Sequence, residues 1–339
     1  MTNEFRQDIV SGDWVLIASV RALRPDALRA GKSRRVMSPR KGCPFEEWAT
    51  MSNEPPVLAY PDDKKNWKMV VIPNKYPILA RGKAGSRSEL FRHGVYQGRT
   101  AVGTAWLLVT RDHDRHFDML SSKEAIEVFE AFRDAHHAGA RDKAMAYVAS
   151  FYNYGPTAGG SIWHPHYQIL TLPVIPTHTI HTFRGAQEYH RRHGTCPRCD
   201  IIAAERRNKK RVIAENDHAI AFAPYASQEP FEVSVLPKKH WPSFRDTSPE
   251  TLRDVALLVR DVLKKVKVRL GDPDLNFYIH DIPLDRKDYD FHHWHVEILP
   301  RTKIEAGFEF STGIGVNAVD PNDAAAILRG DAVVSRTHF

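Results

Sequence analysis

The stretch "GGSIWHPHYQIL", residues 159–170, determines how the whole chain is interpreted, because polar side chains alternate along an otherwise apolar run. In a β-strand, successive side chains point to opposite faces, so His164, His166 and Gln168 would share one face. Burying two imidazoles and an amide on one face costs free energy unless they bind something. The stretch therefore predicts a strand that carries a functional site, entered from a glycine turn.

Length and composition indicate an ordinary globular protein. The chain has 339 residues, enough for two domains, with 42% hydrophobic and 26% charged residues. No apolar run approaches the roughly 18 residues of a membrane span. The N-terminal "MTNEFRQDIVSGDW" lacks the basic and then apolar pattern of a signal peptide. We expect a cytoplasmic protein with no membrane association.

The charge balance and the cysteines narrow the chemistry. A formal net charge of +7 favours an anionic partner, either a phosphorylated small molecule or nucleic acid. The densest basic run, "ERRNKKR" at 205–211, is more typical of a solvated helix end than of a nucleic-acid site, so nucleic acid is not expected. The three cysteines are an odd number and include a Cys-x-x-Cys pair, which favours metal or redox chemistry over disulfides.

The sequence passes twice through one order of elements. Each half contains a strand, a strand followed by a histidine, a helix, a strand, and a strand with His-x-His. The predicted helices are 121–139, with Ser121 and Glu124 spaced as a capping box, and 247–270, with Ser248 as N-cap. The repeat predicts an α+β fold of two tandem domains, 1–185 and 186–339, divided in the polar stretch 177–194.

The second half contains a ligand set for a metal. Cys196 and Cys199 lie two residues apart, and separate strands would bring His240 and His293 to them. Two thiolates and two imidazoles form a tetrahedral zinc set. A redox pair and two cysteines without a joint role are the alternatives.

The first half offers a variant of that set. It contains Cys43, His113 and His164, but Glu46 stands where a second cysteine would be. Because a carboxylate oxygen is an acceptable zinc ligand, we predict a second zinc site here. The alternative is that the first half has lost its metal.

Several motifs resemble one family. They are "HPHYQ" at 164–168 after "NYGPTAGGS", "DIVSGDWVLIASVRALRPD" at 8–26, "IPNKYP" at 72–77 and "AGFEFSTGIGVNAVDPNDAA" at 306–325. Together they resemble the galactose-1-phosphate uridylyltransferase branch of the histidine-triad superfamily over nearly the whole chain. The resemblance implies two histidine-triad-like domains, each a mainly antiparallel sheet with packed helices. It also implies a homodimer, although the tandem repeat could satisfy its sheet edges internally.

The chemistry at 159–168 can also be argued from the residues. A nucleophilic histidine must be neutral and oriented, with one ring nitrogen held and the other free, as His166 would be on a rigid strand. The glycine turn supplies backbone N–H groups for a phosphate, and Ser161 adds a hydroxyl. Gln168 cannot ionise, so it can orient phosphoryl oxygens but cannot exchange protons. This arrangement suits group transfer between phosphates better than water activation.

The resemblance assigns a role to each matching position. His166 looks like the nucleophile and Gln168 like its phosphate-binding partner. The predicted phosphate- and nucleotide-binding residues are Arg21, Arg24, Asn74, Asn153, Gly159, Gly160 and Ser161. The predicted hexose-binding residues are Lys303, Phe308 and Glu309. The second His-x-His places His295 at the position of His166, but Glu297 replaces the glutamine and no glycine turn precedes it, so no second active centre is expected.

The leading hypothesis is a nucleotidyltransferase that exchanges nucleoside monophosphate between UDP-glucose and galactose 1-phosphate through a nucleotidyl-His166 intermediate. The alternative on the same scaffold is a phosphorylase that uses inorganic phosphate with ADP-glucose or a dinucleoside polyphosphate. The expected partners are therefore a nucleotide sugar and either a sugar phosphate or phosphate. A hydrolase of nucleotide phosphoramidates or dinucleotides, and a zinc-stabilised nucleic-acid-binding protein, are hypotheses from other classes.

Overall fold

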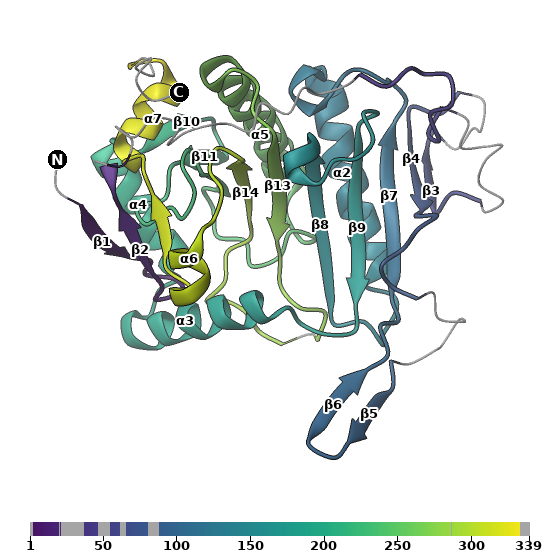
Figure 1. Cartoon of the computed structure of the whole chain (residues 1–339), viewed down its shortest axis with the longest axis horizontal. Coiled ribbons are helices and arrows are strands. Elements are labelled where there is room, and N and C mark those ends of the chain that lie inside the picture. Colours follow the sequence, from purple (N-terminus) through teal and green to yellow (C-terminus); the bar gives the residue numbers. More distant parts are fainter. Residues whose placement is uncertain are drawn as a thin grey trace.

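The computed structural model of the protein describes residues 3–19, 21, 37–46, 55–61, 66–80, 88–285 and 287–332. Its centre is one ten-stranded antiparallel sheet with the order β10-β11-β12-β14-β13-β8-β9-β7-β4-β3 (Figure 1). The strands are β3 (Leu58–Tyr60), β4 (Met69–Pro73), β7 (Thr104–Thr110), β8 (Tyr147–Tyr154), β9 (His166–Leu172), β10 (Val212–Glu215), β11 (Ala219–Phe222), β12 (Val233–Pro237), β13 (Leu275–His280) and β14 (His295–Pro300).

The sheet has an internal two-fold repeat. Five strands from the first half, β3-β4-β7-β9-β8, meet five from the second, β13-β14-β12-β11-β10, and the halves join where β8 pairs with β13. The paired strands at this seam occupy equivalent places in the two halves. The α+β fold class and the order of elements predicted from the repeat are confirmed, and the histidine-bearing strands β9 and β14 are symmetric neighbours of the seam.

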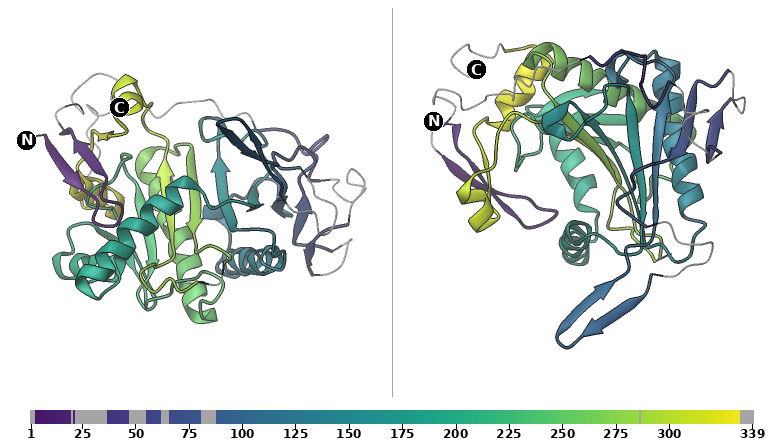
Figure 2. Two further views of the ribbon diagram at one scale, coloured as in Figure 1. Left: turned by 90° about the horizontal axis from the view of Figure 1, so that it is seen from below. Right: turned by 45° about the vertical axis from the view of Figure 1, so that its right-hand side comes forward.

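Two long helices cover one face of the sheet. They are α2 (Ser122–Gly139) and α5 (Pro249–Leu270), and both N-caps are the serines expected from the sequence. Ser121 and Glu124 form the capping box, and the side chain of Ser248 accepts from Thr251 N. Their apolar faces pack against the strands and form the main core. Figure 2 shows the helices and the sheet from two further directions.

The opposite face of the second half is covered by α3 (Thr177–His193) and α4 (Pro197–Asn208). A small sheet of β1 (Glu4–Gln7), β2 (Trp14–Ile17) and β15 (Gly315–Asn317) lies beyond them, next to α6 (Gly307–Thr312) and α7 (Pro321–Arg329) (Figure 1). The polar stretch 177–194, expected to separate two domains, is mostly the helix α3. The division at residues 185 and 186 falls within that helix and stays a prediction.

The remaining elements are short. Two 3-10 turns, η2 (Phe117–Met119) and η3 (Pro156–Ala158), follow β7 and β8 in the chain. The hairpin of β5 (Leu90–His93) and β6 (Tyr96–Arg99) projects from the body (Figure 1). Among the helices that the structure describes, none combines the length and the apolar character needed to cross a membrane.

Candidate active site and metal clusters

His166 begins strand β9 and is only 9% exposed. Its Nδ1 donates to the carbonyl oxygen of His164 at 2.9 Å, which assigns the proton to Nδ1 and leaves the lone pair on Nε2. The Phe45 ring lies 5.1 Å from the imidazole, centroid to centroid. Burial lowers the pKa of His166, so the ring is held neutral as well as oriented. These are the properties that a histidine nucleophile requires.

A cavity of about 200 Å³ opens beside His166. The loop between β8 and β9 forms much of its wall, and it contributes Gly155, Gly160 and Ser161. Gly155 has a φ of 89°, and a Cβ on Gly160 would lie 2.8 Å from the carbonyl oxygen of Asn153. Larger residues would therefore force this loop open. The glycines allow backbone groups to come close to a bound phosphate.

Strand alternation places Gln168 on the same face as His166 and Tyr167 on the other. Tyr167 is fully buried against Phe132 and Tyr152, so it packs in the core, as its strand position predicts. Asn153 lies on neighbouring β8 and lines the cavity, where its Oδ1 accepts from Asn276 Nδ2 at 2.9 Å. Of the predicted residues, His166, Asn153, Gly160 and Ser161 line this cavity, whereas Gln168 and Gly159 are not among its lining residues.

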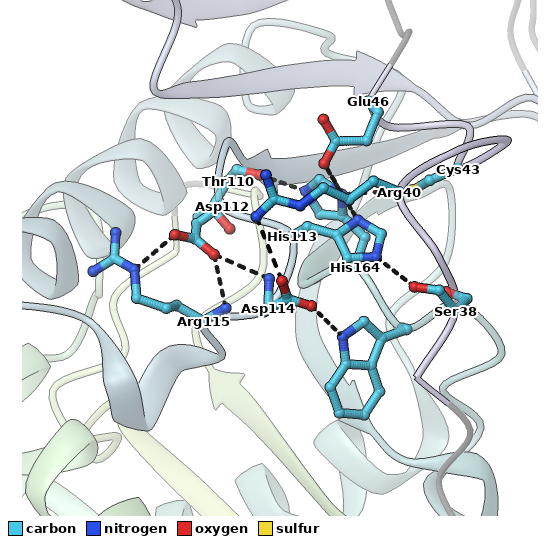
Figure 3. A network of polar contacts seen from close by, with 11 residues as sticks. Ser38, Arg40, Cys43, Glu46, Thr110, Asp112, His113, Asp114, Arg115 and His164 are labelled. Atoms are coloured by element: carbon cyan, nitrogen blue, oxygen red, sulfur yellow. Dashed lines mark hydrogen bonds and ion pairs between the residues drawn. The ribbon is translucent and has the colours of Figure 1, made fainter.

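The predicted ligands of the first half lie close together (Figure 3). The Nδ1 atoms of His113 and His164 lie 3.2 Å apart, and Cys43 Sγ lies 3.6 Å from His164 Nδ1. Glu46 Oε1 approaches to 3.3 Å from His113 Nδ1 and 3.8 Å from His164 Nδ1. Glu46 thus lies beside both histidines, but it is not one of the three residues, Cys43, His113 and His164, whose ligand atoms all lie within 4.8 Å of one another.

The tautomers show why a cation suits this cluster. His113 Nε2 faces the carbonyl oxygen of Ser38 at 2.8 Å, and His164 Nε2 faces that of Thr110 at 2.6 Å. Because carbonyls only accept, both protons lie on Nε2, and the two Nδ1 lone pairs face each other. A tetrahedral zinc ion with bonds of about 2.0–2.3 Å separates its ligand atoms by roughly 3.3–3.8 Å, which is close to these distances.

A matching cluster lies in the second half. Cys196, Cys199, His240 and His293 place one ligand atom each within 4.8 Å of one another. Cys199 Sγ lies 3.3 Å from His240 Nδ1 and 3.6 Å from His293 Nδ1. Hydrogen bonds from Cys199 and then from the two histidines lower the pKa of the Cys196 thiol, which favours the thiolate that binds zinc. Both clusters could hold a metal ion.

Several predicted residues lie elsewhere. Strand register places Asn74 level with Leu170, about 13 Å along the sheet from His166. Arg21 is exposed and lines none of the described cavities, and Arg24 lies outside the described residues. Lys303, Phe308 and Glu309 lie on and before α6, which Figure 1 shows beside β2, with β14, β13 and β8 between it and β9. Their nucleotide- and hexose-binding roles stay predictions.

The cavity and its surroundings also contain residues that sequence reasoning missed. The Phe45 ring contacts those of His164 and His166. His116 and Trp163 line the cavity, and their ring centroids lie 5.0 Å apart in an edge-to-face contact. Trp163 Nε1 donates to Asp114 Oδ1 at 3.1 Å. The position of Phe45 between Cys43 and Glu46 was a usable signal, because the two ligands on either side of it must approach His164. His116 had no comparable signal.

The fold and the site define a class of protein: a duplicated α+β fold with an oriented histidine beside a glycine-lined cavity and clusters of side chains that could hold metal ions. A family model described as a domain of unknown function, DUF4921, matches residues 117–336. ADP-glucose phosphorylase of Arabidopsis thaliana is 30% identical over 331 residues, covering 96% of this chain and 92% of the relative. Galactose-1-phosphate uridylyltransferase of Thermotoga maritima is 24% identical over 336 residues, covering 96% and 98%.

Solved structures agree with these sequence matches. The crystal structure of an ADP-glucose phosphorylase from Arabidopsis thaliana with bound ADP-glucose has a TM-score of 0.83 and 27% identity, covering 98% of this chain and 100% of that one. The chain belongs to the galactose-1-phosphate uridylyltransferase family, which includes ADP-glucose phosphorylase. It is a nucleotidyltransferase enzyme.

Proposed function

We propose that this enzyme is a phosphorylase that transfers the adenylyl group of ADP-glucose to inorganic phosphate, releasing glucose 1-phosphate and ADP. The observation that carries the proposal is the fixed, neutral His166 at the wall of the glycine-lined cavity. The choice of ADP-glucose, which ranks below UDP-glucose on the sequence alone, rests on the Arabidopsis phosphorylase matching the chain over 96% of its length.

The reaction proceeds by double displacement. In the first step, Nε2 of His166 attacks the α-phosphorus of ADP-glucose, and the bond from that phosphorus to the bridging oxygen breaks. Glucose 1-phosphate leaves, and adenylyl-His166 remains. In the second step, an oxygen of inorganic phosphate attacks the same phosphorus, ADP leaves, and neutral His166 is restored. Glucose 1-phosphate leaves as a stable anion in the first step and His166 leaves as a neutral imidazole in the second, so neither step needs strong proton donation.

The neighbouring residues position the phosphates in this proposal. Backbone N–H groups of the glycine loop, the Ser161 hydroxyl and the Asn153 amide would stabilise charge on the α-phosphate oxygens. Gln168 would orient those oxygens without exchanging protons. Zinc, when bound, would supply rigidity at Cys43, Glu46, His113 and His164, and the His164 carbonyl in turn orients His166.

Uridylyl transfer between UDP-glucose and galactose 1-phosphate is the second candidate. It is favoured by the match to the Thermotoga uridylyltransferase, which spans 98% of that relative. The two candidates use the same His166 chemistry and differ in the base and in the acceptor. The two candidates can therefore be told apart by which nucleotide sugar transfers its nucleotidyl group to His166.

Intact-protein mass spectrometry after brief incubation with ADP-glucose or UDP-glucose, without any acceptor, tests the proposal. We expect a mass gain of one adenylyl group that disappears in His166→Ala and on addition of inorganic phosphate. His137→Ala, which removes an exposed histidine on α2, is the matched control and should keep the adduct. A larger gain with UDP-glucose would select the uridylyl candidate. A folded, zinc-loaded enzyme that gains mass with neither nucleotide sugar would contradict both.

A further inference from the structure

The second half encloses a larger cavity of about 630 Å³ that the proposed reaction does not use. It lies against the sheet face opposite α2 and α5, under α3 and α4, and is closed by the β1–β2 loop. Its volume is that of sites for small organic ligands. The residues of α4 that line it recur at helical spacing and are Arg198, Asp200, Ile201, Ala204 and Glu205.

Strand register shows that this cavity is the duplicate of the His166 site. His166 and Gln168 begin β9 as His295 and Glu297 begin β14. On the neighbouring strand, Gln168 pairs with Phe151 and Glu297 with Tyr278, which makes Asn153 the counterpart of His280. The His295 ring is held as His166 is, with Nδ1 donating to the carbonyl oxygen of His293 at 3.1 Å.

The duplicate has different chemistry. Glu297 accepts from His280 Nε2 at 2.8 Å, and no glycine loop equivalent to residues 155–161 lines this cavity. A carboxylate in the place of Gln168 repels a phosphate brought up to His295. The second cavity therefore lacks the geometry for nucleotidyl transfer, but polar side chains still line the strands at its base.

Two arginines in the wall have no close anionic partner. Arg198 Nε is buried without a hydrogen bond, and neither Arg198 nor Arg301 forms an ion pair within the part of the chain that the structure describes. Asp8, Glu232 and Glu297 act on Arg198 only from longer range. Both arginines are half-buried, and the unsatisfied Nε of Arg198 makes an anionic ligand group the expected complement.

Carboxyl groups face the same space. Glu232 is 7% exposed, and its Oε2 accepts from the backbone N–H groups of Gln228 at 2.8 Å and Glu229 at 3.2 Å. Burial, and then the charge of Glu297, raise the pKa of Glu232 well above its ordinary value, so it can donate as well as accept. With His295 and Tyr278, this wall offers donors and acceptors suited to hydroxyl groups.

We propose that this cavity is a second, non-catalytic binding site for a phosphorylated sugar, with the phosphate at Arg198 and Arg301 and the hydroxyl groups at Glu232, Glu297 and His295. The proposal goes beyond nucleotidyl transfer and does not rest on the choice between ADP-glucose and UDP-glucose. The duplication of the fold explains this arrangement. The first half carries the proposed reacting histidine, and the second half has a pocket at the equivalent position, lined by side chains that could bind a ligand.

Equilibrium dialysis with labelled glucose 1-phosphate tests the proposal on the full-length, zinc-loaded chain. Ala204→Trp fills the cavity from α4, and Ala203→Trp places the same side chain on the exposed side of that helix as a matched control. We expect Ala204→Trp to bind one molecule fewer per chain than wild type and Ala203→Trp to bind as wild type. Arg301→Gln, remote from the cysteines, should weaken this site about tenfold.

Three results would overturn the proposal. The first is equal binding by wild type and a folded Ala204→Trp, and the second is an unchanged affinity in Arg301→Gln. The third is inorganic phosphate binding the cavity as tightly as glucose 1-phosphate, which would remove the sugar from the assignment. Adenylylation of His166 is measured separately and should be the same in all three variants. A failure here is therefore distinguishable from a failure of the proposed reaction.

Discussion

The buried histidines of this chain differ in what the second ring nitrogen meets. In His166 that nitrogen is free for a substrate, because Nδ1 is occupied by a backbone carbonyl. In His113 and His164 it faces other ligand atoms. In His136 both nitrogens lie near side chains, with Nε2 2.7 Å from Ser150 Oγ and Nδ1 3.3 Å from Asp281 Oδ2. The proposed nucleophile, the candidate metal ligands and the structural residue are therefore all buried histidines that differ in their hydrogen-bond partners.

The metal clusters give a prediction at the same scale. Because Cys199 Sγ lies close to both histidines of its cluster, Cys199→Ser should remove one zinc per chain and lower the melting temperature. Glu46→Ala should leave the first cluster with three ligands and make its zinc easier to remove with a chelator. Zinc per chain, measured by plasma mass spectrometry after dialysis against EDTA, checks both.

The control for these variants is Glu89→Ala, which removes an exposed carboxylate beside β5. It should retain as much zinc as wild type. Equal zinc content in wild type, Cys199→Ser and Glu46→Ala would contradict the assignment of both clusters. Loss of both metals in Glu46→Ala would show instead that the clusters are not independent.

At the scale of elements, one ion-pair network fixes the segment that carries His113 to helix α2. Arg115 donates to both carboxylate oxygens of Glu124, at 2.9 and 2.6 Å, and to Asp112 at 2.8 Å. Glu124 also closes the capping box on Ser121. The network therefore joins the end of β7, the segment of the candidate ligand His113 and the start of α2 (Figure 3 shows Asp112, His113 and Arg115).

Removing the charge of Glu124 gives a pH-dependent prediction. The hydrogen bond from Arg115 lowers the pKa of Glu124 to about 2 against partial burial, so its stabilisation is present above its ordinary pKa of 4.5 and disappears as pH falls through about 2. Glu124→Gln should lose about 1 kcal/mol of unfolding free energy at pH 7, after allowance for solvent screening, and almost none near pH 2. Urea unfolding at both pH values checks the sign.

The neighbouring pair on the same helix is the control. Lys123 and Glu127 approach only to 3.9 Å, so Glu127→Gln should change stability little at either pH. A loss for Glu124→Gln that is as large at pH 2 as at pH 7 would show that packing, rather than charge, is responsible.

Prediction from the sequence succeeded where a pattern was local. Capping residues and apolar spacing placed α2 and α5 within a few residues of their bounds, and alternation placed His166 and Gln168 on one face. The helix α3 was missed because only a narrow stripe, including Phe183 and Ala186, is buried along its polar surface. Arg198 and Glu232 were missed because their meeting around one cavity depends on strands and helices far apart in the sequence.

At the scale of the molecule, the repeat predicted two halves but could not predict which edges meet. The seam pairs β8 with β13, and Phe277 lies in its centre, fully buried against Phe117, Tyr152 and Tyr167. Residues from both halves thus share one aromatic core. The two halves should therefore unfold together.

Phe277→Ala tests this coupling. We expect a loss of about 3–5 kcal/mol in the free energy of unfolding and a single urea transition, coincident by circular dichroism and tryptophan fluorescence. Val268→Ala on α5, where the side chain is 76% exposed, is the control and should change stability by less than about 0.5 kcal/mol. Two separate transitions in wild type would contradict the coupling.

The seam has a further consequence for shortened gene products. A fragment containing only the first half would end its sheet at β8, and the backbone N–H and C=O groups that pair with β13 would be left open. Such an edge is a template for pairing with other copies of itself. Premature stop codons between the halves should therefore yield insoluble aggregates rather than a half-sized working enzyme, although the fragment would contain His166 and the whole glycine loop.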